Sequence, residues 1–261
     1  MRIFGWVTTR RDHGKLIFID LRDRSGIVQV VFTPKSQDYD LAQKFRSEWV
    51  LNVVGKVQQR PTEMVNKEVE TGEIEIVPES TEILSEAQTP PFSLDTDGYE
   101  IGEEIRMKYR YLDLRRGRMK KNIMLRHKVS FLTRDFLNRQ GFVEIETPTL
   151  TKTSPEGARD FVVPSRFHPG KFYALPQAPQ QYKQLLMIAG FEKYYQIAHA
   201  FRDEDLRGDR QFEHTQIDIE MSFADEKDVW STVEELMVYI TESLGKKITK
   251  KPFPVFSHAE A

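Results

Sequence analysis

Side chains that could bind a phosphate group are concentrated between residues 201 and 223, in the sequence FRDEDLRGDRQFEHTQIDIEMSF. Residues 215–223 alternate polar and apolar side chains, which predicts a β-strand with one polar face. Residues 194–201 predict a second strand, so the charged residues between the two form the loop of an antiparallel hairpin. The guanidinium of Arg202 is suited to pair with a phosphate there. The alternative is a solvated hairpin with surface ion pairs, because runs of charge are usually exposed surface.

Five segments in the first third of the chain are rich in β-branched and aromatic residues, which predicts strands. They are residues 3–8, 16–22, 27–32, 49–58 and 72–82, and residues 36–47 between the third and fourth predict a helix. This order predicts a five-stranded OB-fold barrel. A generic small β-barrel is the alternative.

The rest of the chain predicts a mixed domain. Pro90 and Pro91 mark residues 85–97 as a linker. Apolar residues at helical spacing predict helices at 119–139, 180–189 and 227–244, and residues 142–146 predict one more strand. We therefore expect the α+β class, with a barrel domain at residues 1–84, a hinge at 85–118, and an antiparallel sheet flanked by helices at 119–261.

The composition excludes several classes of protein. With 38 basic and 40 acidic residues, any nucleic-acid site must come from a local patch and not from the net charge of −2. No cysteine is present, which excludes disulfides and thiolate metal sites, and we predict no metal-ligand set. No run of residues is apolar enough to span a membrane, and the N-terminus lacks the apolar core of a signal peptide. We expect a cytoplasmic protein without a membrane partner.

Several sequence blocks resemble the class II aminoacyl-tRNA synthetases, and within that class the bacterial and organellar aspartyl enzymes. FRDEDLRGDRQ, at residues 201–211, resembles motif 2, a hairpin that holds ATP. GFVEIETPTL, at residues 141–150, resembles motif 1, which forms the dimer interface in the family, so the resemblance implies a homodimer. The GARD block at residues 157–160 favours the aspartyl enzymes over their asparaginyl and lysyl relatives.

The resemblance implies an aspartate–tRNA ligase. Such an enzyme joins L-aspartate to ATP as aspartyl-adenylate, with Mg²⁺ bridging the phosphates, and transfers the aspartyl group to tRNA(Asp). A lysine at position 183 would pair with the β-carboxylate of aspartate and leave asparagine unpaired. The implied aspartate-binding residues are Glu156, Gln180, Lys183, Arg202 and Asp218. The implied ATP-binding residues are Arg202, Asp203, Glu204, Gln211 and His214, of which Arg202 is the catalytic one because it stabilises the charge on the α-phosphate.

The barrel block GWVTTRRDHGKLIFIDLRDRSGIVQVVF, at residues 5–32, resembles the family's anticodon-binding barrel. The implied anticodon-binding residues are Arg11, His13, Phe18, Gln29 and Glu75. Phe18 would stack on a base, although a core position for this ring is the alternative. His13 stands where strictly specific members have Leu, which suggests that tRNA(Asn) is accepted as well as tRNA(Asp).

The chain also departs from the family pattern. His214 stands where Phe is usual, Phe212 where Pro is usual, and Ala178 where Ser is usual. Motif 3, a glycine-rich segment with an arginine for the γ-phosphate, is not found in these residues. Ser257 and Glu260 form a capping box that predicts a helix start at Ser257, and the sequence given ends one residue after the box. We therefore expect a truncated enzyme that forms no adenylate alone. A non-catalytic tRNA-binding module is the alternative.

Overall fold

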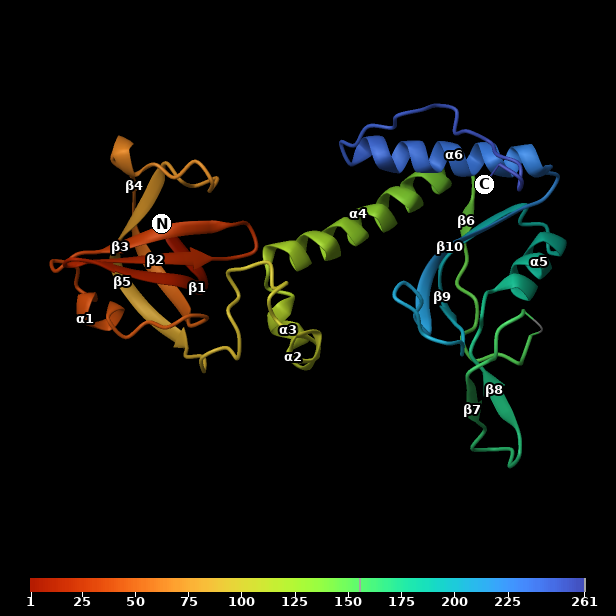
Figure 1. The fold of residues 1–261 in the computed structure, drawn as a ribbon, viewed down its shortest axis with the longest axis horizontal. Coiled ribbons are helices and arrows are strands. Elements are labelled where there is room, and N and C mark those ends of the chain that lie inside the picture. Colours follow the sequence, from red (N-terminus) through yellow and green to blue (C-terminus); the bar gives the residue numbers. More distant parts are fainter. Residues whose placement is uncertain (155, 261) are drawn as a thin grey trace. The chain divides into compact units, whose positions relative to one another are not determined.

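The computed structural model describes residues 1–154 and 156–260 and separates into two compact units, Met1–Asn122 and Ile123–Ala261 (Figure 1). The division falls inside helix α4 (Gly117–Arg139). The domain boundaries expected at residues 84 and 118 stay a prediction.

The first unit contains a closed barrel with the strand order β1-β2-β3-β5-β4. Its strands are β1 (Arg2–His13), β2 (Leu16–Arg22), β3 (Ile27–Phe32), β4 (Val50–Gln59) and β5 (Ile74–Ser85). Strands β3 and β5 pair in parallel and the other neighbours are antiparallel. Helix α1 (Tyr39–Ala42) joins β3 to β4, and a short turn of 3-10 helix, η1 (Thr62–Met64), lies between β4 and β5. The five-stranded barrel predicted from the sequence is confirmed.

Helix α1 is much shorter than the helix expected at residues 36–47. The chain leaves the helix after Ala42 because Phe45 inserts into the barrel core, edge-on to Phe32. The guanidinium of Arg10 donates to the carbonyl of Gln43 and so satisfies a backbone group at the helix end. Tertiary packing therefore sets the length of this helix.

A β-bulge at Thr8 decides which side chains of β1 point outward. Val7 pairs with Leu21 and Thr9 pairs with Asp20, so Thr8 is an extra residue with no partner on β2. Beyond the bulge, Arg11 pairs with Phe18. Side chains that pair directly across two strands lie on the same face. Arg11 and Phe18 therefore share the outer face of the barrel.

The segment between the barrel and α4 is held by buried ion pairs. It includes helices α2 (Glu103–Lys108) and α3 (Arg110–Asp113). The buried guanidinium of Arg116 donates to Asp113 Oδ1 at 2.9 Å and to the carbonyl of Ser93 at 2.7 Å. A Cβ atom at Gly98, which has φ +78°, would lie 2.6 Å from Arg116 Nε. Glycine is therefore required beside this arginine.

The second unit is built on a three-stranded sheet with the order β10-β9-β6 (Figure 1). The strands are β6 (Val143–Glu144), β9 (Lys193–Phe201) and β10 (Glu213–Met221), and β9 and β10 form the antiparallel hairpin predicted from the sequence. A separate pair of strands comprises β7 (Val162–Pro164) and β8 (Phe172–Ala174).

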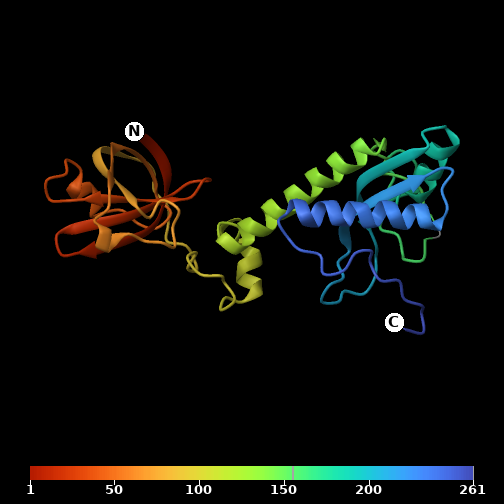
Figure 2. The same cartoon turned by 90° about the horizontal axis from the view of Figure 1, so that it is seen from above.

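Helices cover the sheet of this second unit (Figure 2). Helix α6 (Glu226–Ser243) and the second half of α4 pack on one face around Tyr195. Helix α5 (Gln180–Ile188) contacts β10 through Lys183, which reaches Asp218. Because Asp218 alternates with Ile219, a member of the α4–α6 core, α5 lies against the opposite, polar face. Within the described ranges, no helix combines the length and apolarity needed to cross a membrane.

Candidate functional site

The polar face of the β9–β10 hairpin contains an ammonium group between two carboxylates. Lys183 is only 8% exposed, and its Nζ donates to Asp218 Oδ1 at 2.9 Å. Glu220 Oε2 lies 3.2 Å from the same Nζ. Burial alone would lower the pKa of Lys183, but the hydrogen bonds and charges of Asp218 and Glu220 outweigh it, and the pKa is raised. The side chain is therefore a permanent cation at neutral pH.

Asp218 has one carboxylate oxygen left over. Burial raises the pKa of this carboxyl, and the hydrogen bond and charge of Lys183 offset part of that increase. Asp218 Oδ2 is buried and, in the described part of the chain, accepts no hydrogen bond. An unsatisfied buried acceptor is costly, so this oxygen is suited to receive a donor from a ligand. The face thus offers a cation for a carboxylate and a carboxylate oxygen for an ammonium group.

Tyr194 and Gln196 complete this face, and the sequence did not single them out. They pair in register with Glu220 and Asp218, respectively, and so share their side of the sheet. Gln196 Oε1 accepts from the Tyr194 hydroxyl at 2.7 Å and from Thr147 Oγ1 at 2.9 Å. Burial, together with the nearby charges of Asp218 and Glu220, raises the pKa of Tyr194, so its hydroxyl stays a donor. Strand alternation and register could have identified both residues.

The loop that carries Glu156 is fixed by Gln177, a second residue missed from the sequence. Gln177 is buried, accepts from the backbone N–H of Ala158 at 3.0 Å and donates to its carbonyl at 2.8 Å. Its amide therefore pairs with the loop as a neighbouring strand would. Glu156 is half-buried and accepts from Ser154 Oγ at 3.1 Å. Gln180, at the first position of α5, is half-buried as well.

The hairpin loop meets the GARD loop in one pocket. Arg202 lies at the end of β9, half-buried, and its backbone N–H donates to the carbonyl of Phe212 at 2.8 Å. The backbone N–H of Asp203 donates to the carbonyl of Arg159 at 3.0 Å. Together the two loops line a pocket of about 520 Å³, formed by Gly157, Ala158, Arg159, Asp203, Glu204, Asp205, Arg207 and Arg210.

Of the residues predicted for the nucleotide, Asp203 and Glu204 line this pocket, and Gln211 and His214 follow it in the chain. Glu204 and Gln211 are exposed, and His214 is half-buried on the same face of the hairpin as Asp218. Among the described residues, no three His, Asp or Glu side chains gather in a group that could hold a metal ion. The structure thus joins Lys183 and Asp218 directly, whereas Gln180, Gln211 and His214 make no side-chain hydrogen bond in the described residues.

In the first unit, four of the predicted anticodon residues share the outer face of the barrel. Arg11 pairs with Phe18 across β1 and β2, and Gln29 pairs with Glu75 across β3 and β5. Phe18 is half-buried and lies outside the apolar core cluster. His13 is exposed at the end of β1. The barrel therefore presents an aromatic ring among hydrogen-bonding groups.

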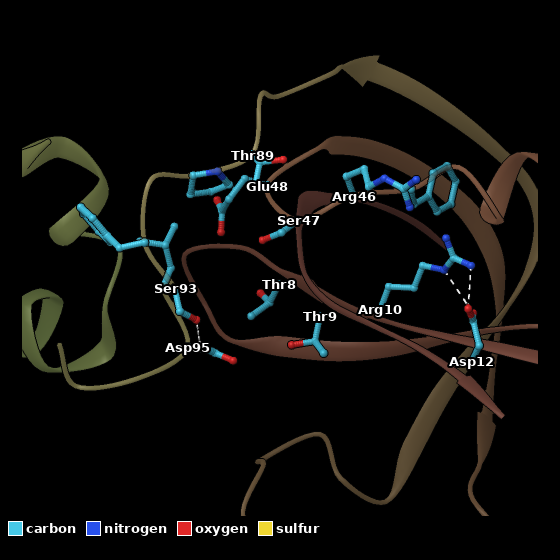
Figure 3. Close-up of a pocket in the computed structure, with 14 residues that line it drawn as sticks. Thr8, Thr9, Arg10, Asp12, Arg46, Ser47, Glu48, Thr89, Ser93 and Asp95 are labelled. Atoms are coloured by element: carbon cyan, nitrogen blue, oxygen red, sulfur yellow. Dashed lines mark hydrogen bonds and ion pairs between the residues drawn. The ribbon is translucent and has the colours of Figure 1, made fainter. Parts of the chain in front are cut away.

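A pocket of about 610 Å³ lies elsewhere in the first unit, between the barrel and residues 89–95 (Figure 3). Polar side chains line it from both sides, and Arg10 pairs there with Asp12 at 2.7 Å. None of the residues predicted to bind aspartate, ATP or an anticodon lines this pocket.

These features combine a closed five-stranded barrel with a second unit whose polar sheet face holds a buried ion pair. Residues 1–84 match the family model of the OB-fold nucleic acid binding domain, and residues 102–261 match that of the class II tRNA synthetases (D, K and N). The chain therefore belongs to the class II tRNA synthetase family, which confirms the resemblance seen in the sequence.

Among its relatives are two bacterial proteins named aspartate–tRNA(Asp/Asn) ligase. The chain is 56% identical over 259 residues to that of Syntrophomonas wolfei, covering 98% of this chain and 44% of the relative. It is 57% identical over 261 residues to that of Halothermothrix orenii, covering 99% of this chain and 44% of the relative. The chain thus spans less than half the length of these relatives.

A solved structure resembles the fold. The asparaginyl-tRNA synthetase from Pyrococcus horikoshii, complexed with asparaginyl-adenylate, matches with a TM-score of 0.80 and 26% identity, over 93% of this chain and 54% of that one. The assignments of individual residues to aspartate, ATP and the anticodon stay predictions.

Proposed function

We propose that this chain carries the aspartate-binding and anticodon-binding parts of an aspartate–tRNA ligase. The observation that carries the proposal is the buried group formed by Lys183, Asp218 and Glu220. Its charges complement an amino acid with an acidic side chain, and close relatives are named aspartate–tRNA(Asp/Asn) ligase. The substrates are L-aspartate, ATP and tRNA(Asp), with tRNA(Asn) as a further acceptor, and the protein acts in the cytoplasm.

Lys183 provides the selectivity for aspartate. Its ammonium pairs with the β-carboxylate, and the carboxamide of asparagine cannot replace this charge. Asp218 Oδ2, which is free of partners within the described residues, accepts from the substrate ammonium. Glu156 approaches the same ammonium from its loop, and Gln180 lies beside it at the start of α5.

Arg202 aligns and neutralises the reacting phosphate. An oxygen of the aspartate α-carboxylate attacks the α-phosphorus of ATP while the bond to pyrophosphate breaks, which forms aspartyl-adenylate. A hydroxyl of the terminal tRNA adenosine then attacks the aspartyl carbonyl and AMP leaves. The nucleotide is held by Asp203, Glu204, Gln211 and His214. Mg²⁺ arrives with the phosphates of ATP, since this ion binds through few carboxylates plus substrate oxygens, and no residue is assigned as its ligand.

The barrel selects the tRNA through its anticodon. Phe18 stacks on a base, while Arg11, Gln29 and Glu75 provide donors and acceptors to neighbouring bases. His13 relaxes the distinction between tRNA(Asp) and tRNA(Asn). A second copy of the chain contacts residues 141–150, so the working form is a homodimer.

Amino-acid binding tests whether the group formed by Lys183, Asp218 and Glu220 is an aspartate site. We expect calorimetry to detect L-aspartate binding and at least a tenfold weaker response to L-asparagine, with the response to aspartate lost in Lys183→Met. The exposed Lys171→Met is the matched control and should bind as the unmodified chain does. Equal binding of aspartate and asparagine would overturn the proposal.

ATP–pyrophosphate exchange tests whether these residues activate aspartate without the rest of the ligase. The closed barrel and the short span relative to the relatives favour a chain that binds RNA without activating aspartate alone. We expect no exchange from the purified chain, together with measurable binding of a tRNA(Asp) anticodon stem-loop. Exchange that depends on aspartate would instead assign complete adenylate chemistry to these residues.

A further inference from the structure

A row of hydrogen bonds crosses the outer face of the barrel. Arg11 donates to both carboxylate oxygens of Asp20, at 2.6 and 2.9 Å, and its Nη2 lies 3.4 Å from Gln29 Oε1. Gln29 Nε2 donates to Glu75 Oε2 at 3.0 Å. From the other side, Gln58 Nε2 donates to Glu75 Oε1 at 2.6 Å. One residue from each of the five strands takes part.

Strand register brings these side chains together. Asp20 pairs with Gln29 across β2 and β3, and Gln29 pairs with Glu75 across β3 and β5. Gln58 pairs with the same Glu75 across β4 and β5. Because paired residues share a face, the closed barrel places Gln58 on the face that also carries Arg11 and Phe18.

Glu75 is the central member of the row and is unusual for a carboxylate. It is 6% exposed, and its neighbour Gln29 is 8% exposed. In the described ranges no Lys, Arg or His forms an ion pair with Glu75, and its two oxygens accept from two neutral amides instead. An ionised carboxylate can only accept, so both glutamines must turn their NH₂ groups toward it. This fixes the amide of Gln29 with its oxygen toward Arg11.

We infer that Gln58, which was not among the predicted site residues, is a positioning residue for base reading by the barrel. The inference rests on the proposed anticodon-binding function. One N–H of the Gln29 amide is committed to Glu75, and its second N–H remains for a base. Gln58 satisfies the other oxygen of Glu75. Without it, that buried oxygen competes for the second N–H of Gln29, because an unsatisfied buried acceptor is costly.

The test compares two substitutions at Gln58 in the full chain. Gln58→Met keeps the size of the side chain and removes the donor, whereas Gln58→Arg restores a donor. Gln59→Met is the matched control, because Gln59 is an exposed neighbour that points to the other side of β4. Gln58 is itself exposed, so the variants should fold.

The measurement is the binding of labelled stem-loop RNAs. One carries the anticodon GUC, and the others carry a single base change at each anticodon position. The readout is the ratio of Kd values between changed and unchanged loops. We expect Gln58→Met to reduce the largest ratio by roughly 5- to 10-fold, the loss of about one hydrogen bond. Gln58→Arg should recover most of it, and Gln59→Met should leave it unchanged.

Salt dependence separates positioning from a general structural role. Gln58→Met removes no charged side chain, so the slope of log Kd against log salt should be the same for this variant as for the unmodified chain. If Gln58→Met keeps the same ratio of Kd values between changed and unchanged loops, the inference is overturned and the anticodon-binding function still stands. Weaker binding of all loops by the same factor also overturns it. An unmodified chain that does not distinguish the loops overturns both the inference and the anticodon-binding function.

Discussion

The two units of this protein each bury a carboxylate, and they complete its hydrogen bonding in opposite ways. In the barrel, both oxygens of Glu75 accept from neutral amides, so the group is satisfied before any ligand arrives. On the hairpin, Asp218 gives one oxygen to Lys183, and its other oxygen has no partner among the described residues. The difference indicates a preorganised binding surface in the first unit and, in the second, a site whose hydrogen bonding a ligand would complete.

The largest expected effect comes from removing Lys183, the one cation that pairs with Asp218 and Glu220 among the described residues. Lys183→Met leaves two carboxylates together on a buried face, and breaking a buried pair in this way costs about 3–5 kcal/mol of unfolding free energy. Urea denaturation measures the loss. Lys171→Met, at an exposed position, is the control and should change stability little. A loss below about 1 kcal/mol would show that Asp218 does not depend on this cation.

In the barrel, changing the carboxylate to an amide should cost less. Glu75→Gln preserves the shape but turns an NH₂ group toward Gln29 or Gln58, leaving a donor without an acceptor, at a cost of ~1–3 kcal/mol. The exposed Glu73→Gln is the matched control. Thermal or urea unfolding reports the difference. Equal stability of the two variants would mean that the row of hydrogen bonds rearranges freely.

The hairpin site should also respond gradually to alkaline pH. The pKa of Lys183 is raised above its ordinary 10.5 in the folded chain. A raised pKa means that the folded state holds this proton more tightly, so its contribution is complete below pH 10.5 and is lost as the pH rises through the folded value. Side-chain NMR should show Lys183 titrating above pH 10.5. Titration below pH 10.5 would contradict the assigned ion pair.

The smallest effect is expected at the exposed end of the barrel row. Asp20 and Arg11 form a two-pronged ion pair, but the Arg11 side chain is 51% exposed. Pairs open to solvent contribute less than about 1 kcal/mol. Asp20→Asn should therefore lower the unfolding free energy by less than Glu75→Gln does, in the same denaturation experiment. The reverse order would show that the row is anchored at Arg11 and not at Glu75.

Local patterns in the sequence predicted most elements. Strands β2 and β3 begin and end where their β-branched and aromatic residues placed them, at residues 16–22 and 27–32. The hairpin of β9 and β10 agrees to within two residues at each end. These features depend on neighbours a few residues apart, which a single sequence records.

Features that depend on distant strands were missed. Gln58 acquires its partner through the register of β4 with β5, which no local pattern records. Gln177 pairs with the backbone of a loop nineteen residues away, and this contact cannot be predicted from the residue type alone. The predicted length of α1 was wrong for the same reason, because the insertion of Phe45 into the core depends on tertiary packing.

The bulge at Thr8 shifts the alternation of inward and outward side chains along β1 by one residue. Before it, every second residue belongs to the barrel core, and after it the inward positions are shifted by one. In a regular strand without the bulge, Thr8 would take an outward position, and Arg10 and Arg11 would exchange directions. An engineer who transfers the sequence of β1 to another barrel would therefore have to provide room for this bulge, although Thr8 contributes no side chain to the row.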